Sequence, residues 1–462
     1  MPTVPGASGT FASFPTAIQN IIQQGFLERE MEEGLDSILA YDREALVETI
    51  PCRIGESLTR TRKGRVTPTT TALVPSAINS GLDNGLTPVQ FANEQYTYQV
   101  YQYGQAADVN IMQEQAGAAD LLVATARNLG VAAAQTRERL AKQALFASYL
   151  GGNTRVRGDL AAPTTTTARV DDIRGFGMVL VNGTPTPISG TNPLQVTEID
   201  TSGAGVNQTL NVTGVVADVT NVSSCPDGIS GTITFTTATA PVTGDALIAK
   251  GAPQILRPGN AVSTAQLKSG SNFTLSLIED AVALLRDNAV PTHPDSTYHC
   301  ILDNRSERQL LADQDFKIYY AGREQSDAIR TAYVIRLLGI TFIPTTEAYV
   351  QKPFTADANN TVTPTIRRPV MTGAEHLLRG DYEGLETWIN REGLNPIGTI
   401  TLVNNVAQVL RPMLDRLQQV LSLAWFWAGA YAIPTDVTAT TDIIPTASDA
   451  LFKRAVVMEH AS

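Results

Sequence analysis

Residues 116–150, AGAADLLVATARNLGVAAAQTRERLAKQALFASYL, are the longest stretch of helical periodicity in the sequence, and they contain no proline. Apolar residues recur along this stretch at steps of three and four, which places them on one face of a helix. A helix of this length would be roughly 50 Å long, and the pair Gly151–Gly152 predicts its end. So long an apolar face requires an equally long partner surface elsewhere in the protein.

Two apolar segments near the end of the chain are the candidates for that partner surface. Residues 398–410, GTITLVNNVAQVL, and 417–433, LQQVLSLAWFWAGAYAI, read as strands that pair. Trp425, Trp427 and Tyr431 share one face by the period of two, and apolar residues also occupy the other face. We therefore predict a strand buried on both faces, with helix residues packed beneath Trp425 or Trp427, namely Leu122, Leu129 and Leu140.

The segment before the helix has the alternation of strands. Residues 46–112 contain two polar strand patterns, joined by about 20 residues rich in Thr, Pro, Gly and Asn. They predict an extended hairpin, and because an isolated hairpin is marginally stable in water, we expect it to lie on a neighbouring subunit. The cluster RTRKGR at 60–65 is either a solvated face of this hairpin or a docking patch for an acidic neighbour, made of Arg60, Arg62, Lys63 and Arg65.

The segment after the helix changes composition sharply. No Lys, Arg or His occurs from Gly175 to Ala249, and Thr, Val, Gly, Ser, Asn and Asp dominate. Short strand patterns with turns between them predict a small β-sandwich or barrel, inserted between about residues 160 and 262. From Phe273 onward helices and strands alternate, which predicts a mixed α/β or α+β domain. Its first helix shows a capping-box pair, Ser276 and Glu279.

The overall composition limits the class of protein. At 462 residues the chain is long enough for about two or three domains. A formal net charge of −11 argues against a nucleic-acid binder that works through a basic face. The cysteines Cys52, Cys225 and Cys300 form no CxxC, so neither a disulfide framework nor a thiolate zinc site is indicated. The longest apolar run is too short to span a bilayer, and we expect a protein kept in the cytoplasm or in something assembled there.

No catalytic constellation stands out in the sequence. The histidines His293, His299, His376 and His460 are widely separated, without metal-site spacing, and no phosphate-binding loop is present. We interpret several charged motifs as solvated surface or turns: the acid pairs Asp171–Asp172 and Glu32–Glu33, the GDYEG piece at 380–384, and the helix residues Arg127, Arg137, Arg139 and Lys142. The sequence therefore predicts no catalytic residue, no cofactor site and no metal site.

The order of these segments resembles that of tailed-bacteriophage major capsid proteins of the Hong Kong 97 type. Three pieces look similar to that family: AIRTAYVIRLLGITFIPTTEAYV at 328–350, RPMLDRLQQVLSLAWFWAGAYAIPTD at 411–436, and the ending ALFKRAVVMEHAS at 450–462. The resemblance implies an α+β fold with an N-terminal arm at 1–45, an extended hairpin (the E-loop) at 46–115, a spine helix of the peripheral domain at 116–159, an inserted β-rich domain at 160–262, an axial domain at 263–390, and return strands of the peripheral domain with the C-terminus at 391–462.

The resemblance implies a structural protein of the virion capsid, without enzymatic activity. Such a protein forms pentamers and hexamers of itself in an icosahedral shell, assembled in the host cytoplasm around double-stranded DNA that it does not bind sequence-specifically. Its other partners are a portal and scaffolding or cement proteins, and it does not involve a membrane. Two alternatives remain open: the shell of an encapsulin-like compartment, and an α/β enzyme with a β-insertion.

Overall fold

A computed structural model describes the following residues: 26–36, 39–51, 57–66, 68–70, 93–110, 118–158, 162–181, 184–201, 205–321, 336–355, 361–382, 400–411, 416–417, 419–433, 436–437, 443–444 and 450–462. Within these ranges the chain has a mixed α+β fold with few helices and many strands. Residues 1–25 of the predicted arm, most of the hairpin tip and the predicted helix before residue 336 lie outside the described residues.

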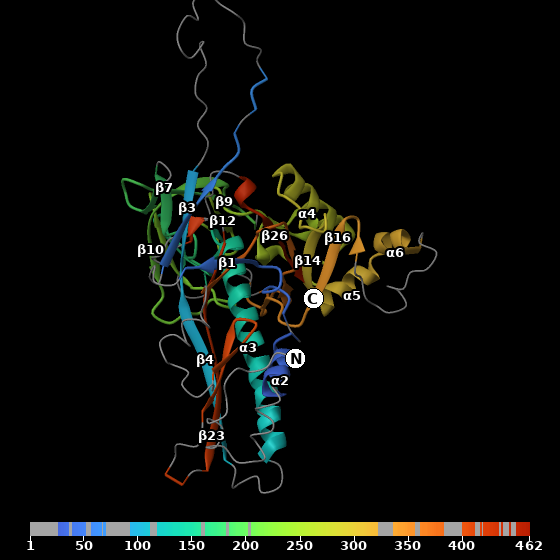
Figure 1. The fold of residues 1–462 in the computed structure, drawn as a ribbon. Helices are drawn as coiled ribbons and strands as arrows, with labels where there is room; N and C mark the ends of the chain where they lie inside the picture. Colours follow the sequence, from blue (N-terminus) through green and yellow to red (C-terminus); the bar gives the residue numbers. More distant parts are fainter. Residues whose placement is uncertain are drawn as a thin grey trace, which may run out of the picture.

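The long helix predicted at 116–150 is confirmed. Helix α3 runs over Ala118–Tyr149 and lies along strand β23 (Val420–Ala432), with β4 (Tyr101–Asn110) paired to the same strand (Figure 1). Leu122, Leu129, Trp425 and Trp427 belong to one buried cluster, and Leu140 packs against it partly buried. The predicted partner surface of the helix is therefore confirmed.

Strand β23 is the centre of a six-stranded sheet. The order is β1 (Leu46–Ile50), β20 (Leu378–Tyr382), β23, β22 (Val406–Arg411) and β21 (Ile400–Val403), and β4 also pairs with β23. Burial alternates along β23: Leu423, Trp425 and Trp427 are buried, whereas Ala424 and Phe426 are half-buried. The prediction of a strand buried on both faces is wrong over residues 420–428, because α3 covers only one face of the sheet there.

A second helix packs against the side of α3 that the sheet does not cover. Helix α2 (Phe26–Asp36) places Leu27, Met31 and Leu35 in the same cluster as the tryptophans. It passes through Gly34 without a break, and a Cβ at Gly34 would lie 2.6 Å from the carbonyl oxygen of Arg127. Gly34 therefore allows α2 to approach α3 closely and does not interrupt the helix.

The charge-poor segment forms a closed barrel. Its strand order is β10 (Gln208–Ala217), β11 (Gly231–Phe235), β6 (Thr167–Val170), β5 (Asn153–Arg157), β12 (Ala246–Ala249) and β9 (Leu194–Ile199). Strands β7 (Met178–Val181) and β8 (Thr184–Pro187) form a separate hairpin. The barrel begins at Asn153 rather than near 160, because β5 follows α3 after a single turn.

The third part is a sheet covered by helices. Its order is β13 (Ile255–Leu256), β26 (Ala455–Met458), β19 (Val370–Thr372), β14 (Tyr298–Asp303), β16 (Ile340–Thr345) and β15 (Arg336–Leu337). Helices α4 (Leu275–Asp287), α5 (Asn304–Ala312) and α6 (Gln314–Ala321) contribute to its core. The sequence-based domain bounds assign β13 to the inserted domain and β26 to the return strands. In the structure both strands belong to this sheet.

The remaining elements of the described chain are short. A small sheet joins β17 (Val350–Gln351), β18 (Ile366–Arg367) and β27 (His460–Ala461), and β24 (Asp436–Val437) pairs with β25 (Ile443–Ile444). The 3-10 turns are η2 (Pro258–Asn260), η3 (Thr264–Gln266) and η4 (Ala450–Phe452). The predicted capping box at Ser276 is wrong, because α4 already begins at Leu275, whose N–H donates to Asp313 Oδ2 at 2.8 Å.

Candidate functional site at the base of the hairpin

The predicted hairpin is present, and its basic cluster lies on one strand of it. Strands β2 (Ser57–Lys63) and β3 (Asn93–Gln99) pair antiparallel. Arg60 Nε lies 3.0 Å from Glu48 Oε1, and the Arg62 guanidinium lies 4.1 Å from the centre of the Phe452 ring. These two residues contact their own chain. The side chains of Lys63 and Arg65 are exposed to solvent. The docking role of the four residues stays a prediction.

The segment Ala40–Ala45 connects α2 to β1, the strand of the central sheet that precedes the hairpin, and α3 holds it in place. Glu138 on α3 is fully buried and accepts three backbone hydrogen bonds. Its Oε1 accepts the N–H groups of Ala40 and Tyr41 at 3.1 and 2.9 Å, and its Oε2 accepts that of Asp42 at 3.1 Å. A buried carboxylate that satisfies three backbone donors fixes the path of this segment.

Asp42 ties the same segment to the helix and to the central sheet. It accepts Arg137 Nη2 at 2.6 Å, Arg379 Nη1 at 3.1 Å and the hydroxyl of Tyr431. Arg137 is 2% exposed, so its prediction as part of a solvated face is wrong. The pairing with buried Asp42 accounts for its position, because a buried guanidinium requires a carboxylate partner.

The other three basic residues of α3 pair with glutamates. The Lys142 side chain is only 14% exposed, so its interpretation as part of a solvated face is wrong. Arg127 lies 3.0 Å from Glu33, and Arg139 and Lys142 lie 3.1 and 3.8 Å from Glu347. Arg127 and Arg139 are exposed, as predicted.

Asp381 shows that the GDYEG piece is not a turn over its described residues. Gly380, Asp381 and Tyr382 belong to β20, and the buried Asp381 carboxylate accepts the indole N–H of Trp427 at 3.1 Å. Arg379 Nε also donates to Asp381, at 3.0 Å. The turn prediction is wrong for these residues, because β20 pairs with β1 on one side and β23 on the other.

Glu44 brings three of the four histidines together. Its Oε2 contacts His299 Nδ1 and lies 3.7 Å from His293 Nδ1. The rings of His293 and His299 stack in parallel with centroids 3.9 Å apart, and His376 lies edge-on to His293 at 5.8 Å. Sheet pairing explains the proximity, since His299 on β14 stands opposite Thr372 on β19.

The protonation of this cluster follows from its surroundings. Burial alone would raise the pKa of Glu44, but the contact with His299 outweighs it and lowers the pKa. Burial lowers the pKa of His376 to about 3, so this ring is neutral. No sequence pattern predicted this cluster, because residues 44, 293, 299 and 376 share no spacing motif.

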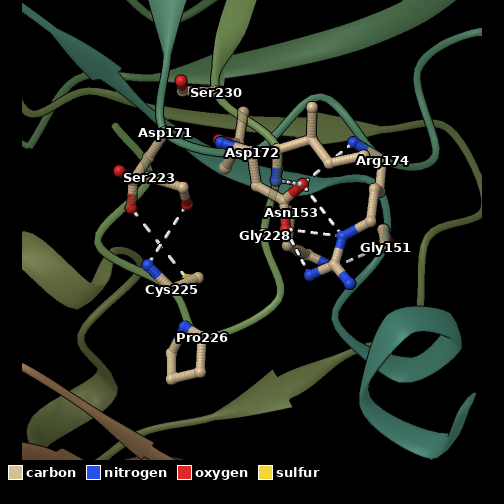
Figure 2. Close-up of polar contacts among 12 residues, drawn as sticks. Gly151, Asn153, Asp171, Asp172, Arg174, Ser223, Cys225, Pro226, Gly228 and Ser230 are labelled. Carbon is tan, nitrogen blue, oxygen red and sulfur yellow. Dashed lines mark hydrogen bonds and ion pairs between the residues drawn. The ribbon is translucent and has the colours of Figure 1, made fainter. Parts of the chain in front are cut away.

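A second polar cluster joins the barrel to the sheets beside it. Asp172 faces Arg174, with Arg174 Nη2 at 2.6 Å from Asp172 Oδ2 and Arg174 Nε at 3.0 Å from both oxygens (Figure 2). Asp171 lies 3.7 Å from Arg155 and 3.6 Å from Arg157. Both aspartates are buried, so their interpretation as an acid pair on a solvated face is wrong, whereas Glu32 and Glu33 are exposed as predicted.

The same cluster extends from the barrel to the neighbouring sheets. Arg368 donates to Glu459 at 2.7 Å and to Gln351, and Arg257 donates to Glu459 at 2.6 Å. Cys225 lies between the two sides, and burial raises the pKa of its thiol to about 12. The thiol is therefore protonated, and the ion pairs make this cluster a structural joint rather than a reactive site.

Cys225 and Cys300 are both free thiols, and Cys52 lies outside the described residues. None of the helices in the described ranges is long and apolar enough to cross a membrane.

Comparisons with known proteins give structural neighbours only. No family model matches the chain, and no curated protein matches it. The capsid of Ralstonia phage GP4 matches at 11% identity over 92% of this chain and 88% of that chain, with a TM-score of 0.48. The capsid of cyanophage Pam1 matches at 9% identity over 92% of this chain and 94% of that chain, with a TM-score of 0.44.

Proposed function

We propose that this chain is a major capsid protein, which assembles into the icosahedral shell around the double-stranded DNA of a tailed bacteriophage. In this proposal α2 is part of the N-terminal arm, β2 and β3 are the E-loop, α3 is the spine of the peripheral domain, and the β14 sheet is the axial domain. The barrel is an insertion carried on the outside of the shell.

The observation that carries the proposal is the thin layer made by α3, β4 and β23. These elements extend together away from the barrel and the β14 sheet, which lie on either side of the upper end of α3 (Figure 1). The 32 residues of α3 span about 48 Å. One face of β23 packs on the helix, and along residues 420–428 the other is only half-buried. An apolar sheet face of this kind is expected to meet another subunit.

The hairpin supports the same reading. Among the described strands, β2 and β3 form a two-stranded sheet of their own, and such hairpins are marginally stable in water. Contact with a neighbouring subunit would stabilise it, and exposed Lys63 and Arg65 would set its register on an acidic surface. Many such contacts, each weak, make a closed shell stable.

The net charge of the chain is compatible with a protein that encloses DNA. With a formal net charge of −11 the chain is expected to enclose DNA without gripping it in a sequence-specific way. The proposal includes assembly in the host cytoplasm, pentamers and hexamers of this chain, a portal, and scaffolding or cement proteins. It includes no enzymatic activity.

Electron microscopy of the purified full chain tests the proposal. We expect uniform closed shells, and dispersed small oligomers under every assembly condition tried would contradict it. Nuclease treatment of particles isolated from producing cells separates a virus from an encapsulin-like compartment. Protected double-stranded DNA supports the virus, and protected protein cargo without DNA supports the compartment.

A further inference from the structure

Glu44, His293 and His299 present three donor atoms to one point in space. Glu44 Oε2, His293 Nδ1 and a ring nitrogen of His299 lie within 4.8 Å of one another. The side chains are largely buried, with exposed fractions of 14%, 7% and 13%. They come from the segment before β1, the loop before β14, and β14 itself. Three elements distant in sequence therefore meet through these donors.

We propose that Glu44, His293 and His299 bind a divalent transition-metal ion of the zinc class. Two imidazole nitrogens and one carboxylate oxygen are a donor set that zinc uses in proteins, with a fourth position left for water or another side chain. Imidazole donors favour zinc, cobalt and nickel over magnesium and calcium, which prefer oxygen ligands.

The outer nitrogens of both rings are already oriented by hydrogen bonds. His299 Nε2 lies 3.2 Å from Asp295 Oδ2, and His293 Nε2 lies 3.4 Å from Thr372 Oγ1. Metal-binding histidines commonly donate their other ring N–H to a carboxylate or another oxygen in this way. The arrangement leaves Nδ1 of each ring directed at Glu44. Because the two rings are parallel to within 3°, one of them has to turn out of the stack before both can bind a shared ion.

The distances are close to those of a tetrahedral site. Bonds of about 2.0–2.2 Å would separate the ligand atoms by roughly 3.3–3.5 Å. Glu44 Oε2 and His293 Nδ1 are 3.7 Å apart, near that value. The direct contact between Glu44 and His299 would have to lengthen as the ion enters between them.

His376 gives an independent indication of a missing partner. Its side chain is fully buried, and its Nδ1 bonds to the carbonyl oxygen of Gly373 at 3.0 Å. Its Nε2 has no hydrogen-bond partner among the described residues. A buried polar atom without a partner is costly, and this one belongs to the ring that packs edge-on against His293. Water bound to the ion would supply that partner.

Calorimetric titration of the full chain, stripped of metal with a chelator, tests the proposal. We expect one equivalent of zinc chloride to bind per chain, no binding of magnesium chloride, and a higher melting temperature with zinc. Glu44→Gln and His299→Gln should each weaken zinc binding at least tenfold, since each removes a ligand. Asp295→Asn should weaken it about 10- to 100-fold. Glu33→Gln, an exposed acid on α2, serves as the matched control and should bind as the original chain does.

Zinc binding with unchanged affinity in both Glu44→Gln and His299→Gln would overturn the proposal. If those variants fail to fold, His299→Cys keeps it testable, because a thiolate is also a zinc and cobalt ligand. Cobalt(II) bound to this variant should show a thiolate charge-transfer band that the original chain lacks. Absence of the band from folded His299→Cys would also refute the site.

Discussion

Glu198 and Asp245 place two carboxyl groups side by side inside the barrel, where both are at most 1% exposed. Asp245 accepts backbone N–H groups from Val242 at 2.8 Å and Thr201 at 3.1 Å, which favours its charged form. Glu198 shares a hydrogen bond with Asp245, and burial raises the pKa of Glu198 from 4.5 to about 7. The proton of the pair therefore resides on Glu198.

This raised pKa predicts a pH dependence of stability. The folded chain binds the Glu198 proton more tightly than the unfolded chain, so its contribution to the free energy of unfolding is full below pH 4.5 and falls as the pH rises to about 7. Glu198→Gln keeps a hydrogen-bond donor toward Asp245 and an acceptor for Gln208. Unlike glutamate, the glutamine side chain does not titrate. We expect the variant to be about 1 to 3 kcal/mol more stable than the original near pH 8, with little difference near pH 4.

Urea unfolding of both proteins at the two pH values measures this difference. A variant that is no more stable than the original near pH 8 would show that folding does not raise the pKa of Glu198.

Gly130 decides how α2 and α3 meet. A Cβ at Gly130 would lie 2.5 Å from the carbonyl oxygen of Met31, so the two helix backbones touch at this position. Helix propensity alone makes Gly130→Ala favourable by about 1 kcal/mol. The contact with Met31 is backbone and has no flexible end that can move aside, so α2 must shift as a unit.

Gly130→Ala is therefore expected to lower the melting temperature despite its better propensity. Asn128→Ala on the exposed side of α3 is the matched control, and it should leave the melting temperature unchanged or raise it. Thermal unfolding followed by circular dichroism measures both. A melting temperature for Gly130→Ala at or above that of the control would mean that α2 does not rest on α3 in solution.

These elements also show what the sequence could predict. Helix α3, strand β23 and their contact follow from periodicity, which is a local property of the chain. Strand β5 was missed because its short sequence NTRVR alternates two arginines, and only the distant Asp171 explains why these are buried. The histidine cluster was missed for a similar reason, since the pairing of β14 with β19 brings its members together. Local patterns carry no information about such pairings.

At the scale of the whole molecule, α3 belongs to two cores. Its first half packs with the tryptophans of β23, and its second half, through Leu145, Phe146 and Tyr149, packs with Tyr41, Tyr349 and Ile433. The segment Ala40–Ala45 lies against the second half and leads into β1 and the hairpin. The path of the chain into the hairpin is thus fixed by contacts with the second of these cores.

The exposed end of the hairpin is where a neighbour would be recognised. Of the four basic residues predicted to dock, Arg60 and Arg62 contact Glu48 and Phe452 of the same chain, so replacing them would disturb the hairpin itself. Lys63 and Arg65 are the exposed pair. Lys63→Glu/Arg65→Glu should therefore leave a folded chain that assembles poorly, with a yield of closed particles reduced at least tenfold, because opposed charges set the register of such contacts.

Particle yield is measured by electron microscopy and sedimentation, and the fold by circular dichroism. Lys250→Glu/Lys268→Glu makes the same change of net charge at exposed residues outside the hairpin, so it separates a local docking contact from a general effect of charge on assembly. Equal yields from the two double variants would remove the docking role from Lys63 and Arg65. A loss confined to the hairpin variant and relieved by added salt would support an acidic neighbour, because salt screens the repulsion between that neighbour and the introduced glutamates.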